Sequence, residues 1–233
     1  MDGMVTIFDP LFSHLSKSLR AGLGDPLLLN DEDGHRYHTI IRQITKHTIQ
    51  TEIQRIQHQP PSSCPPVTLV QALLKGEKMG WVVQKATELG IHSIVPVITD
   101  RSIPRLSPRQ ANHHYERWAR IALEAAQQSE RWTLPTISPL QTIQEWFLAP
   151  PKGMHIMLAE RVQEESLATL PFSSEQEEGI TMIIGPEGGW SPEEIATAKS
   201  HRSSIASLGT GILRAETASL AALAILQARI KYF

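Results

Sequence analysis

The first segment whose residue types could support chemistry spans residues 181–194, TMIIGPEGGWSPEE. A predicted strand, Thr181–Ile184, runs into a loop that contains three glycines. Glycine has no side chain, so the backbone can approach a ligand closely and adopt a positive φ. The segment after the loop favours a helix with Ser191 as the N-cap, Pro192 in the first turn and Glu194 completing a capping box. The pattern predicts a ligand-binding loop at the end of a strand, or else a tight turn before a capped helix.

This first loop lacks the residues that bind phosphate. It contains neither a Gly-Lys-Ser/Thr sequence nor a G-x-G-x-x-G spacing. Two glutamates, Glu193 and Glu194, occupy the predicted start of the helix and would repel a phosphate group. The loop therefore favours a neutral or cationic ligand that is recognised by backbone amides and carbonyls.

The second segment, residues 207–223, reads SLGTGILRAETASLAAL. A predicted strand ends at Leu208, glycines flank Thr210, and the apolar pair Ile212 and Leu213 follows. Apolar residues on an irregular loop can form the walls of a slot for a purine. Arg214 and Glu216 come next, and they are either functional groups or an ordinary pair of charges at the end of a helix.

Other candidate residues carry weaker signals. The neighbouring His113 and His114 would point to different faces of a helix, and no third ligand lies nearby, so we expect no metal. Ser129 has no G-x-S-x-G context, which argues against a hydrolase triad. Residues 100–131 are the most basic stretch, and they predict either a solvated helix face or a surface that contacts phosphates.

The composition suits a globular protein of one large domain or two unequal ones. The 233 residues are 41% hydrophobic and 20% charged, with a formal net charge of -2. This slightly negative charge argues against a protein that binds nucleic acid over its whole surface, so any RNA-binding surface must be a local patch. The only cysteine, Cys64, cannot form an internal disulfide. No apolar run reaches the roughly 20 residues of a membrane span, and the acidic start MDGMVTIFDP does not resemble a signal peptide, so we expect a cytoplasmic protein.

The elements that must position these loops fall on two sides of the proline-rich segment 60–66, PPSSCPP, which predicts a linker. On its N-terminal side, short β-like runs and an intervening helix at SHLSKSLR suggest a small barrel over residues 1–59. On its C-terminal side, apolar runs alternate with helical patterns over residues 67–233, which predicts an α/β fold with a mostly parallel sheet. The predicted strands there are 67–73, 93–97, 155–158, 181–184 and 204–208, and the predicted helices are 78–89, 109–129 and 216–230.

Together these residues resemble a known family. Gly185-Pro186-Glu187-Gly188-Gly189, followed by Ile212-Leu213-Arg214-Ala215-Glu216-Thr217-Ala218, is similar to the paired motifs of RsmE-type 16S ribosomal RNA (uracil-N3)-methyltransferases of the SPOUT superfamily. The similarity continues upstream in KGEKM (75–79), QKATELG (84–90), DRS (100–102) and QSER (128–131), and more loosely in residues 14–25. It covers nearly the whole chain.

The resemblance implies an α/β methyltransferase domain with a deep trefoil knot, preceded by a PUA-like RNA-binding β-barrel. It implies binding of S-adenosylmethionine (AdoMet), a homodimer with active sites near the subunit interface, and no metal. The implied substrate is 16S ribosomal RNA, free or in the small ribosomal subunit. The implied product is N3-methyluridine at one site near the 3′ end, conventionally position 1498.

We expect particular residues to have roles in this reaction. Arg214 follows the apolar pair Ile212-Leu213 and precedes Glu216, which could orient its guanidinium through a charge-assisted hydrogen bond, so we expect both to be catalytic; the alternative is that they only brace the loop. RNA would contact Lys17, Arg20, Lys78, Arg101 and Arg131. AdoMet would contact residues on both glycine-bearing loops and on one further strand: Leu158, Ile183, Ile184, Gly185, Glu187, Gly188, Gly189, Leu208, Gly209, Ile212, Leu213, Thr217 and Ala218.

Three departures from the family pattern affect details. Gly211 stands where many relatives carry a larger residue, Gln127-Gln128 replaces the more usual Glu-Gln, and the N-terminus lacks the expected basic and aromatic start. None of them touches the GPEGG segment. Two rival hypotheses stay open, a non-catalytic RNA-binding protein that keeps the fold and a nucleotide-dependent enzyme of Rossmann type.

Overall fold

The computed structural model describes residues 3–31, 33–62, 64–103, 106–160, 165–171 and 178–230. The chain divides into two compact units, residues 1–61 and 62–233, and each is considered by itself. The division falls inside the proline-rich segment 60–66, where fixed φ angles and missing N–H donors disfavour regular structure. Among the described residues, no helix is long and apolar enough to cross a membrane.

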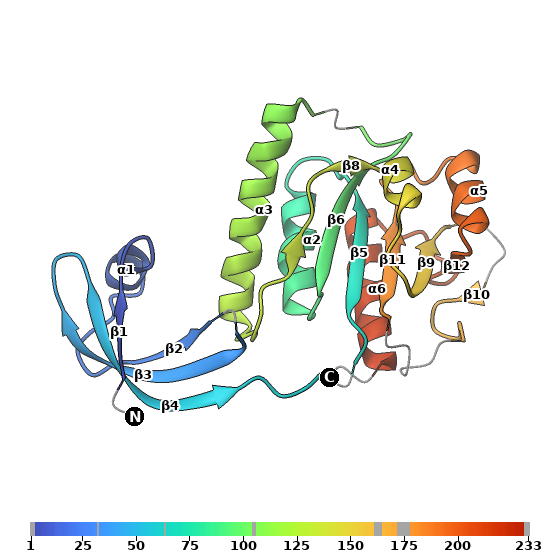
Figure 1. Ribbon diagram of the computed structural model, residues 1–233. Helices are drawn as coiled ribbons and strands as arrows, with labels where there is room; N and C mark the ends of the chain where they lie inside the picture. The colour runs from blue at the N-terminus through green and yellow to red at the C-terminus, as the bar shows by residue number, and fades with distance from the viewer. Residues whose placement is uncertain are drawn as a thin grey trace. The chain divides into compact units, whose positions relative to one another are not determined.

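The N-terminal unit is a four-stranded antiparallel sheet with a short helical segment (Figure 1). A small core is formed by Ile7, Phe12, Leu15, Ile41 and Ile49. A strand occupies the start of the chain, where the family pattern was not recognisable. The predicted helix at SHLSKSLR is only a single turn followed by a π-helical turn. The elements are β1 Met4–Ile7, α1 Leu11–Ser13, the π-helical η1 His14–Ser18, β2 Pro26–Asn30, β3 His35–Ile44 and β4 Ile49–His58, in the order β1-β4-β3-β2.

The C-terminal unit contains a sheet of eight strands in which every paired strand is parallel. The strand order is β10-β12-β9-β11-β5-β6-β7, and β8 also pairs with β6. This confirms the predicted α/β fold with a mostly parallel sheet. The elements are β5 Val67–Ala72, α2 Lys78–Glu88, β6 Ser93–Ile98, α3 Pro108–Gln128, β7 Thr136–Ile137, β8 Gln141–Thr142, α4 Ile143–Leu148, β9 Met154–Leu158, β10 Glu165–Ser166, β11 Ile180–Ile184, α5 Pro192–Ser200, β12 Ser204–Ser207 and α6 Ala215–Arg229.

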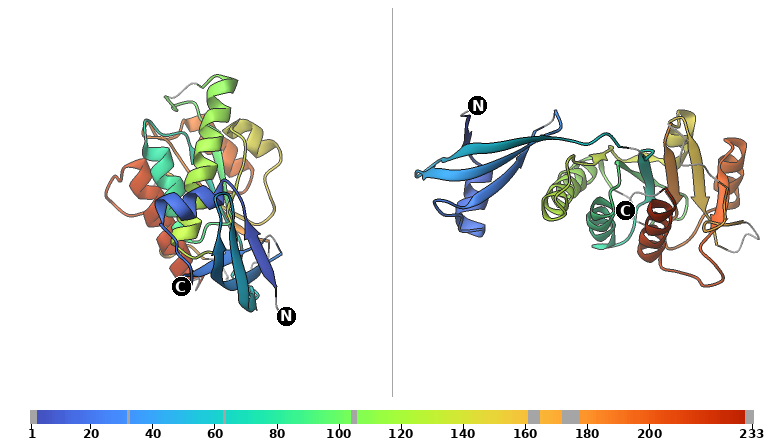
Figure 2. Two further views of the ribbon diagram at one scale, coloured as in Figure 1. Left: turned by 90° about the vertical axis from the view of Figure 1, so that its left-hand side faces the viewer. Right: turned by 90° about the horizontal axis from the view of Figure 1, so that it is seen from below.

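Helices cover both faces of this sheet, which explains why its central strands are mostly apolar and almost entirely buried. Every residue of β11 is buried, and alternate side chains point to opposite faces. Met182 and Ile184 belong to a core shared with α2, α3 and α6, whereas Ile183 belongs to a second core shared with α4 and α5. The right-hand view of Figure 2 shows α2, α3 and α6 along one face of the sheet.

The elements absent from the sequence prediction are short. Strands β7, β8 and β10 have two residues each, and α4 has six, so none carries enough periods of hydrophobicity to be recognised. Helix α4 has a local signal nevertheless, because Thr142 and Glu145 form a capping box. The predicted capping box of Ser191 and Glu194 at the start of α5 is confirmed.

Candidate active site

The two glycine-bearing loops line one cavity of about 570 Å³ beyond the carboxyl ends of β9, β11 and β12. This is the edge at which open parallel sheets bind ligands, and the volume falls in the range of small-molecule sites. The lining residues are Arg101, Leu158, Ala159, Glu160, Ile184, Gly185, Pro186, Glu187, Gly188, Gly189, Trp190, Ile195, Ala206, Ser207, Leu208, Gly209, Gly211, Ile212, Leu213, Arg214, Ala215 and Ala218.

The first loop folds around the side chain of Trp190. This indole is buried, and its Nε1 donates a hydrogen bond of 2.8 Å to the carbonyl oxygen of Leu158, at the end of β9. A Cβ on Gly185 would lie 3.0 Å from the indole ring, so glycine is required there by the packing of Trp190. Gly189 adopts φ +70°, and its N–H donates to the carbonyl of Pro186, which closes the turn.

The turn that follows β6 docks against this first loop. Arg101 donates from its guanidinium to the carbonyl oxygen of Gly188 at 3.1 Å. The backbones approach so closely that a Cβ on Gly188 would lie 3.0 Å from the Cβ of Arg101. Glu194 is buried and accepts hydrogen bonds from the backbone N–H groups of Asp100 and Ser191, both at 2.9 Å. The Ser191 hydroxyl donates to the Asp100 carboxylate at 2.7 Å, so the two segments are locked together.

The second loop connects β12 to α6 and forms the opposite wall. Gly209 adopts φ +119°, a conformation that other residues rarely adopt. Leu213 is half-buried, Ile212 is exposed, and both line the cavity. Arg214 is the exposed N-cap residue of α6, and it also lines the cavity.

A lysine on a third element joins the two loops. The Lys78 Nζ, in the first turn of α2, lies 3.1 Å from Glu187 Oε1 and 3.2 Å from Glu216 Oε2. The hydrogen bond to Glu187 raises the pKa of Lys78 above its ordinary value, and the contact with Glu216 adds to the effect. Burial pushes the pKa of Glu187 upward, but hydrogen bonds from its own N–H, from Lys78 and from the Lys75 N–H outweigh this, so the pKa is lowered.

This arrangement corrects the expected pairing of Arg214 with Glu216. The carboxylate of Glu216 faces Lys78, and no carboxylate among the described residues lies within ion-pair distance of Arg214. The reason is geometric: Arg214 precedes the first turn of α6 and lines the cavity, whereas the carboxylate of Glu216 meets Lys78 of α2.

Eleven of the thirteen predicted cofactor residues line this one cavity, and two, Ile183 and Thr217, do not. Ile183 is fully buried in the core against α4 and α5 and does not line the cavity. Thr217 is exposed and lies off the cavity wall, whereas Ala215 and Ala218 of the same helix line it. Trp190 is the most informative residue that the sequence prediction missed, although it directly follows the glycines. The other missed residues are Ala159, Glu160, Pro186, Ile195, Ala206, Ser207, Gly211 and Ala215.

The five basic residues expected to contact RNA do not form one group. Lys17 and Arg20 are exposed in the N-terminal unit. In the C-terminal unit, only Arg101 of the three lines the cavity. Lys78 is engaged by two carboxylates, and Arg131 donates to the carbonyl oxygen of Thr87 at 2.8 Å. Lys78 and Arg131 therefore stabilise the fold through these contacts, whatever part they also take in binding RNA.

The cavity suits a ligand that carries both charges and an apolar part. Its wall holds two cations, Arg101 and Arg214, and two carboxylates, Glu160 and Glu187, among apolar side chains and glycine backbone. A cluster of carboxylates or histidines that could hold a metal is found in the described residues only at Asp31, Asp33 and His35, in the N-terminal unit. There the Asp31 carboxylate already accepts hydrogen bonds from Tyr37 and from the backbone of its own turn.

Comparisons with known proteins agree with this geometry. A family model described as an RNA methyltransferase domain matches residues 60–227. The chain is 32% identical to ribosomal RNA small subunit methyltransferase E of Synechocystis, covering 99% of this chain and 75% of the relative. It is 34% identical to the protein of the same name from Rickettsia conorii, covering 88% and 82%.

Solved structures extend the similarity to the fold. Ribosomal RNA small subunit methyltransferase E from Neisseria gonorrhoeae, bound to S-adenosyl methionine, superposes with a TM-score of 0.87 at 30% identity, covering 98% of this chain and 93% of the other. A methyltransferase from Legionella pneumophila in complex with the bound cofactor SAM has the same TM-score at 27% identity and the same coverage. The chain belongs to the RNA methyltransferase family and, within it, to the ribosomal RNA small subunit methyltransferases of type E.

Proposed function

We propose that this enzyme methylates ribosomal RNA of the small subunit and binds AdoMet in the cavity between the two glycine-bearing loops. The observation that carries the proposal is the convergence of both loops on one cavity at the carboxyl ends of β9, β11 and β12. Relatives whose solved structures contain the same cofactor support the assignment.

The residues of the cavity fit the chemistry of AdoMet. The adenine is a flat ring with polar edges, which apolar walls such as Ile212 and Leu213 and exposed backbone groups can recognise. The ligand's amino acid part carries an ammonium and a carboxylate, and the cavity offers carboxylates and guanidinium groups to pair with them. The absence of a phosphate-binding pattern in the glycine loop agrees with a cofactor that has no phosphate.

We infer further that the methyl acceptor is N3 of a single uridine in 16S ribosomal RNA, the finer specificity that the family resemblance implies. When bound, AdoMet would supply an electrophilic methyl group on its sulfonium. The protein must then hold the uracil in line and stabilise the negative charge that develops as N3 loses its proton. Arg214 is the candidate for this second task, because it lines the cavity and no described carboxylate neutralises it. Glu187 is a poor base, because its pKa is lowered.

The remaining features of the proposal concern the whole chain. The N-terminal unit would act as a PUA-like RNA-binding barrel, residues 67–233 as a knotted methyltransferase domain, and the functional unit would be a homodimer. The exposed Lys17 and Arg20 support RNA binding by the N-terminal unit. The part-buried apolar side of α6, which includes Leu220, Ala221, Ala224 and Ile225, supports a subunit interface.

The decisive experiment compares 16S ribosomal RNA from cells with and without the gene for this chain by mass spectrometry of nucleosides and fragments. We expect N3-methyluridine at one site to disappear when the gene is absent and to return when it is restored. Binding of AdoMet by the purified protein is measured in parallel by calorimetry. Unchanged RNA modification together with RNA binding would favour the non-catalytic alternative, and failure to bind AdoMet would refute the cofactor assignment.

A further inference from the structure

Three segments far apart in the chain meet at Lys78. Its Nζ lies 3.1 Å from Oε1 of Glu187 in the first cofactor loop and 3.2 Å from Oε2 of Glu216 in the first turn of α6. The Glu187 oxygen also accepts a hydrogen bond of 3.3 Å from the backbone N–H of Lys75, just before α2. The same ammonium therefore touches the elements that carry both walls of the cavity.

The position of Lys78 in α2 is electrostatically unfavourable on local grounds. It is the first residue of the helix, where the helix dipole is positive and acidic residues are preferred. Its N-cap, Glu77, makes no capping hydrogen bond with its side chain and instead pairs with Arg117 of α3. The formation of α2 therefore does not favour a lysine at this position. The lysine is explained by its ion pairs with two carboxylates from other elements, Glu187 and Glu216.

The charge of Glu216 is compensated mainly by Lys78, whereas Glu187 also accepts a hydrogen bond from the backbone N–H of Lys75. The side chain of Glu216 is 13% exposed, and its Oε2 is inaccessible to solvent and makes no well-aligned hydrogen bond within the described residues. Lys78 supplies the positive charge next to it. Removing the ammonium would leave the poorly accessible Glu216 carboxylate without a compensating charge, which costs more than the loss of a fully exposed pair.

We propose that Lys78 is a positioning residue that clasps the two cofactor loops, holding Glu187 and the start of α6 so that the AdoMet cavity is formed before the ligand arrives. This proposal rests on the proposed function and deepens it. Without the ammonium, the two carboxylates would face each other and push the loops apart. A site that is already formed binds its ligand more tightly, because less conformational freedom is lost on binding.

The test compares Lys78→Met with a matched control, Lys85→Met, in the full-length protein. Lys85 lies on the same helix, its side chain is 35% exposed against 34% for Lys78, and it also forms an ion pair, with Glu88 at 2.7 Å. Both substitutions remove the same charge and the same hydrogen-bond donors from α2. Only Lys78→Met is expected to weaken AdoMet binding in calorimetry, by about tenfold or more, and it should also lower the melting temperature more than Lys85→Met, because Glu216 loses its compensating charge.

Rescue experiments separate the clasp from a general effect on stability. Lys78→Arg keeps a cation between the carboxylates and should stay within about threefold of the wild-type Kd. Adding Glu216→Gln to Lys78→Met removes the repulsion, so the double variant should bind AdoMet more tightly than Lys78→Met alone. Strictly additive losses from Lys78→Met and Glu216→Gln would overturn the proposal, as would an AdoMet Kd for Lys78→Met within about twofold of the wild type.

A ligand-free measurement distinguishes failure of the clasp from failure of the proposed function. In hydrogen exchange without AdoMet, Lys78→Met should lose protection in residues 185–190 and 215–219, and Lys85→Met should not. Should the wild-type protein not bind AdoMet at all, the proposed function falls while the exchange data still decide whether Lys78 holds the loops. Unchanged protection in both segments would show that it does not.

Discussion

The residues of the site show that glycines in one loop are required for different physical reasons. Gly185 leaves room for the indole of Trp190, and Gly188 leaves room for the backbone of Arg101. Gly189 has nothing near its missing Cβ, but it needs the positive φ that closes the turn. A single motif, GPEGG, thus combines two close approaches and one unusual backbone conformation.

Arg214 provides the prediction at the scale of one residue. We expect Arg214→Ala to lower kcat by about tenfold or more, about 1.4 kcal/mol of barrier, with little change in AdoMet affinity. The physical reason is that Arg214 lines the cavity and its cation could stabilise negative charge on the uracil. Steady-state kinetics and calorimetry measure the two quantities separately.

Arg214→Lys is the companion variant. It keeps the charge but loses the planar fork, so it should recover only part of the turnover. A variant Arg214→Ala that loses AdoMet binding and melts early, while its turnover at saturating AdoMet is normal, would show that Arg214 serves the structure of the loop rather than the reaction.

Contacts between elements decide the shape of the cavity. The turn after β6 is held on the first cofactor loop by Arg101 and Asp100, and Trp190 ties that loop to the end of β9. These contacts join segments that are far apart in the sequence, whereas hydrophobic periodicity predicts each strand or helix separately. Their loss is expected to damage ligand binding before it damages the sheet, because the strands are stabilised by cores on both faces.

Gly188 tests the contact between the two loops. The added Cβ of Gly188→Ala would already lie 3.0 Å from the Cβ of Arg101, and the branched side chain of Gly188→Val would add further clashes. We therefore expect AdoMet affinity to fall in the order wild type, Ala, Val, as measured by calorimetry. Wild-type affinity in Gly188→Val would contradict this account of the loop.

Helix α6 carries the prediction about assembly. Ala222, Leu223 and Leu226 are buried within one chain, but Ala221 and Ala224 are only partly covered. If this side of the helix forms the proposed subunit interface, Ala221→Glu should place a charge in an apolar contact and produce monomers in sedimentation analysis. The wild-type chain should sediment as a dimer at micromolar concentration, and a wild-type monomer would refute the interface.

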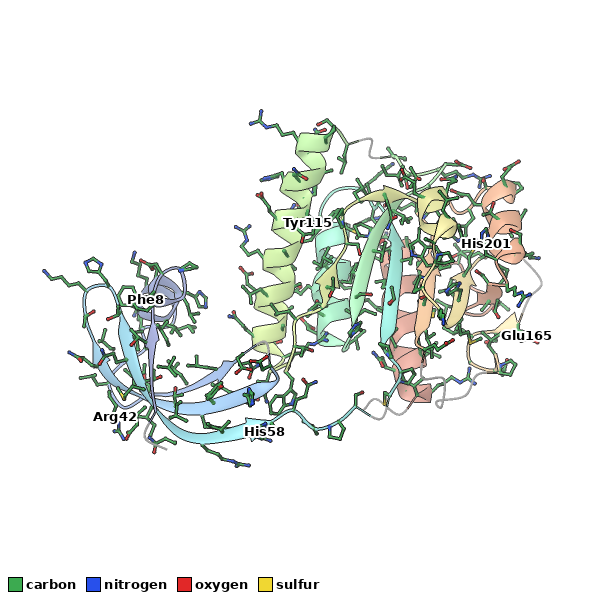
Figure 3. The ribbon with its side chains drawn as sticks, viewed as in Figure 1. Phe8, Arg42, His58, Tyr115, Glu165 and His201 are labelled. Carbon is green, nitrogen blue, oxygen red and sulfur yellow. The ribbon has the colours of Figure 1, made fainter. Side chains whose placement is uncertain are left out.

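At the scale of the whole molecule, each of the two units has a hydrophobic core of its own. The cavity belongs entirely to residues of the C-terminal unit. The N-terminal unit contains no part of it, but it exposes basic residues together with apolar ones such as Phe8, which lies next to α1 in Figure 3. This division predicts that substitutions in the N-terminal unit can change the affinity for RNA without changing the affinity for AdoMet.

Reversing the charge of Lys17 and Arg20 together tests this independence. We expect weaker RNA binding with a smaller dependence on salt, since fewer phosphate counterions would be released. AdoMet affinity should stay unchanged, because neither residue lines the cavity. Filter binding over a range of salt concentrations, with calorimetry as the control, measures both. Equal RNA affinity in the variant and the wild type would remove the N-terminal unit from the proposal.

The sequence by itself determined the features that depend on neighbouring residues. Alternating apolar runs predicted the parallel sheet, because strands and helices have characteristic periods. The capping box of Ser191 and Glu194 was recognisable because its interactions are formed within a few residues, and the GPEGG loop was recognisable by its glycines, which let a backbone approach a ligand. Most of the residues that line the cavity could also be predicted, since the loops that follow neighbouring parallel strands lie at the same edge of the sheet.

Only the tertiary structure decided which side chains become partners across the fold. It paired Glu216 with Lys78 instead of Arg214, placed Arg101 against Gly188, and buried Ile183 in the core against α4 and α5. These outcomes depend on the register of strands and the rotation of helices about their axes. A shift of one residue turns a side chain of a strand to the opposite face of the sheet and moves a side chain of a helix by about 100° around the axis. No local pattern specifies which distant charge the side chain will then meet.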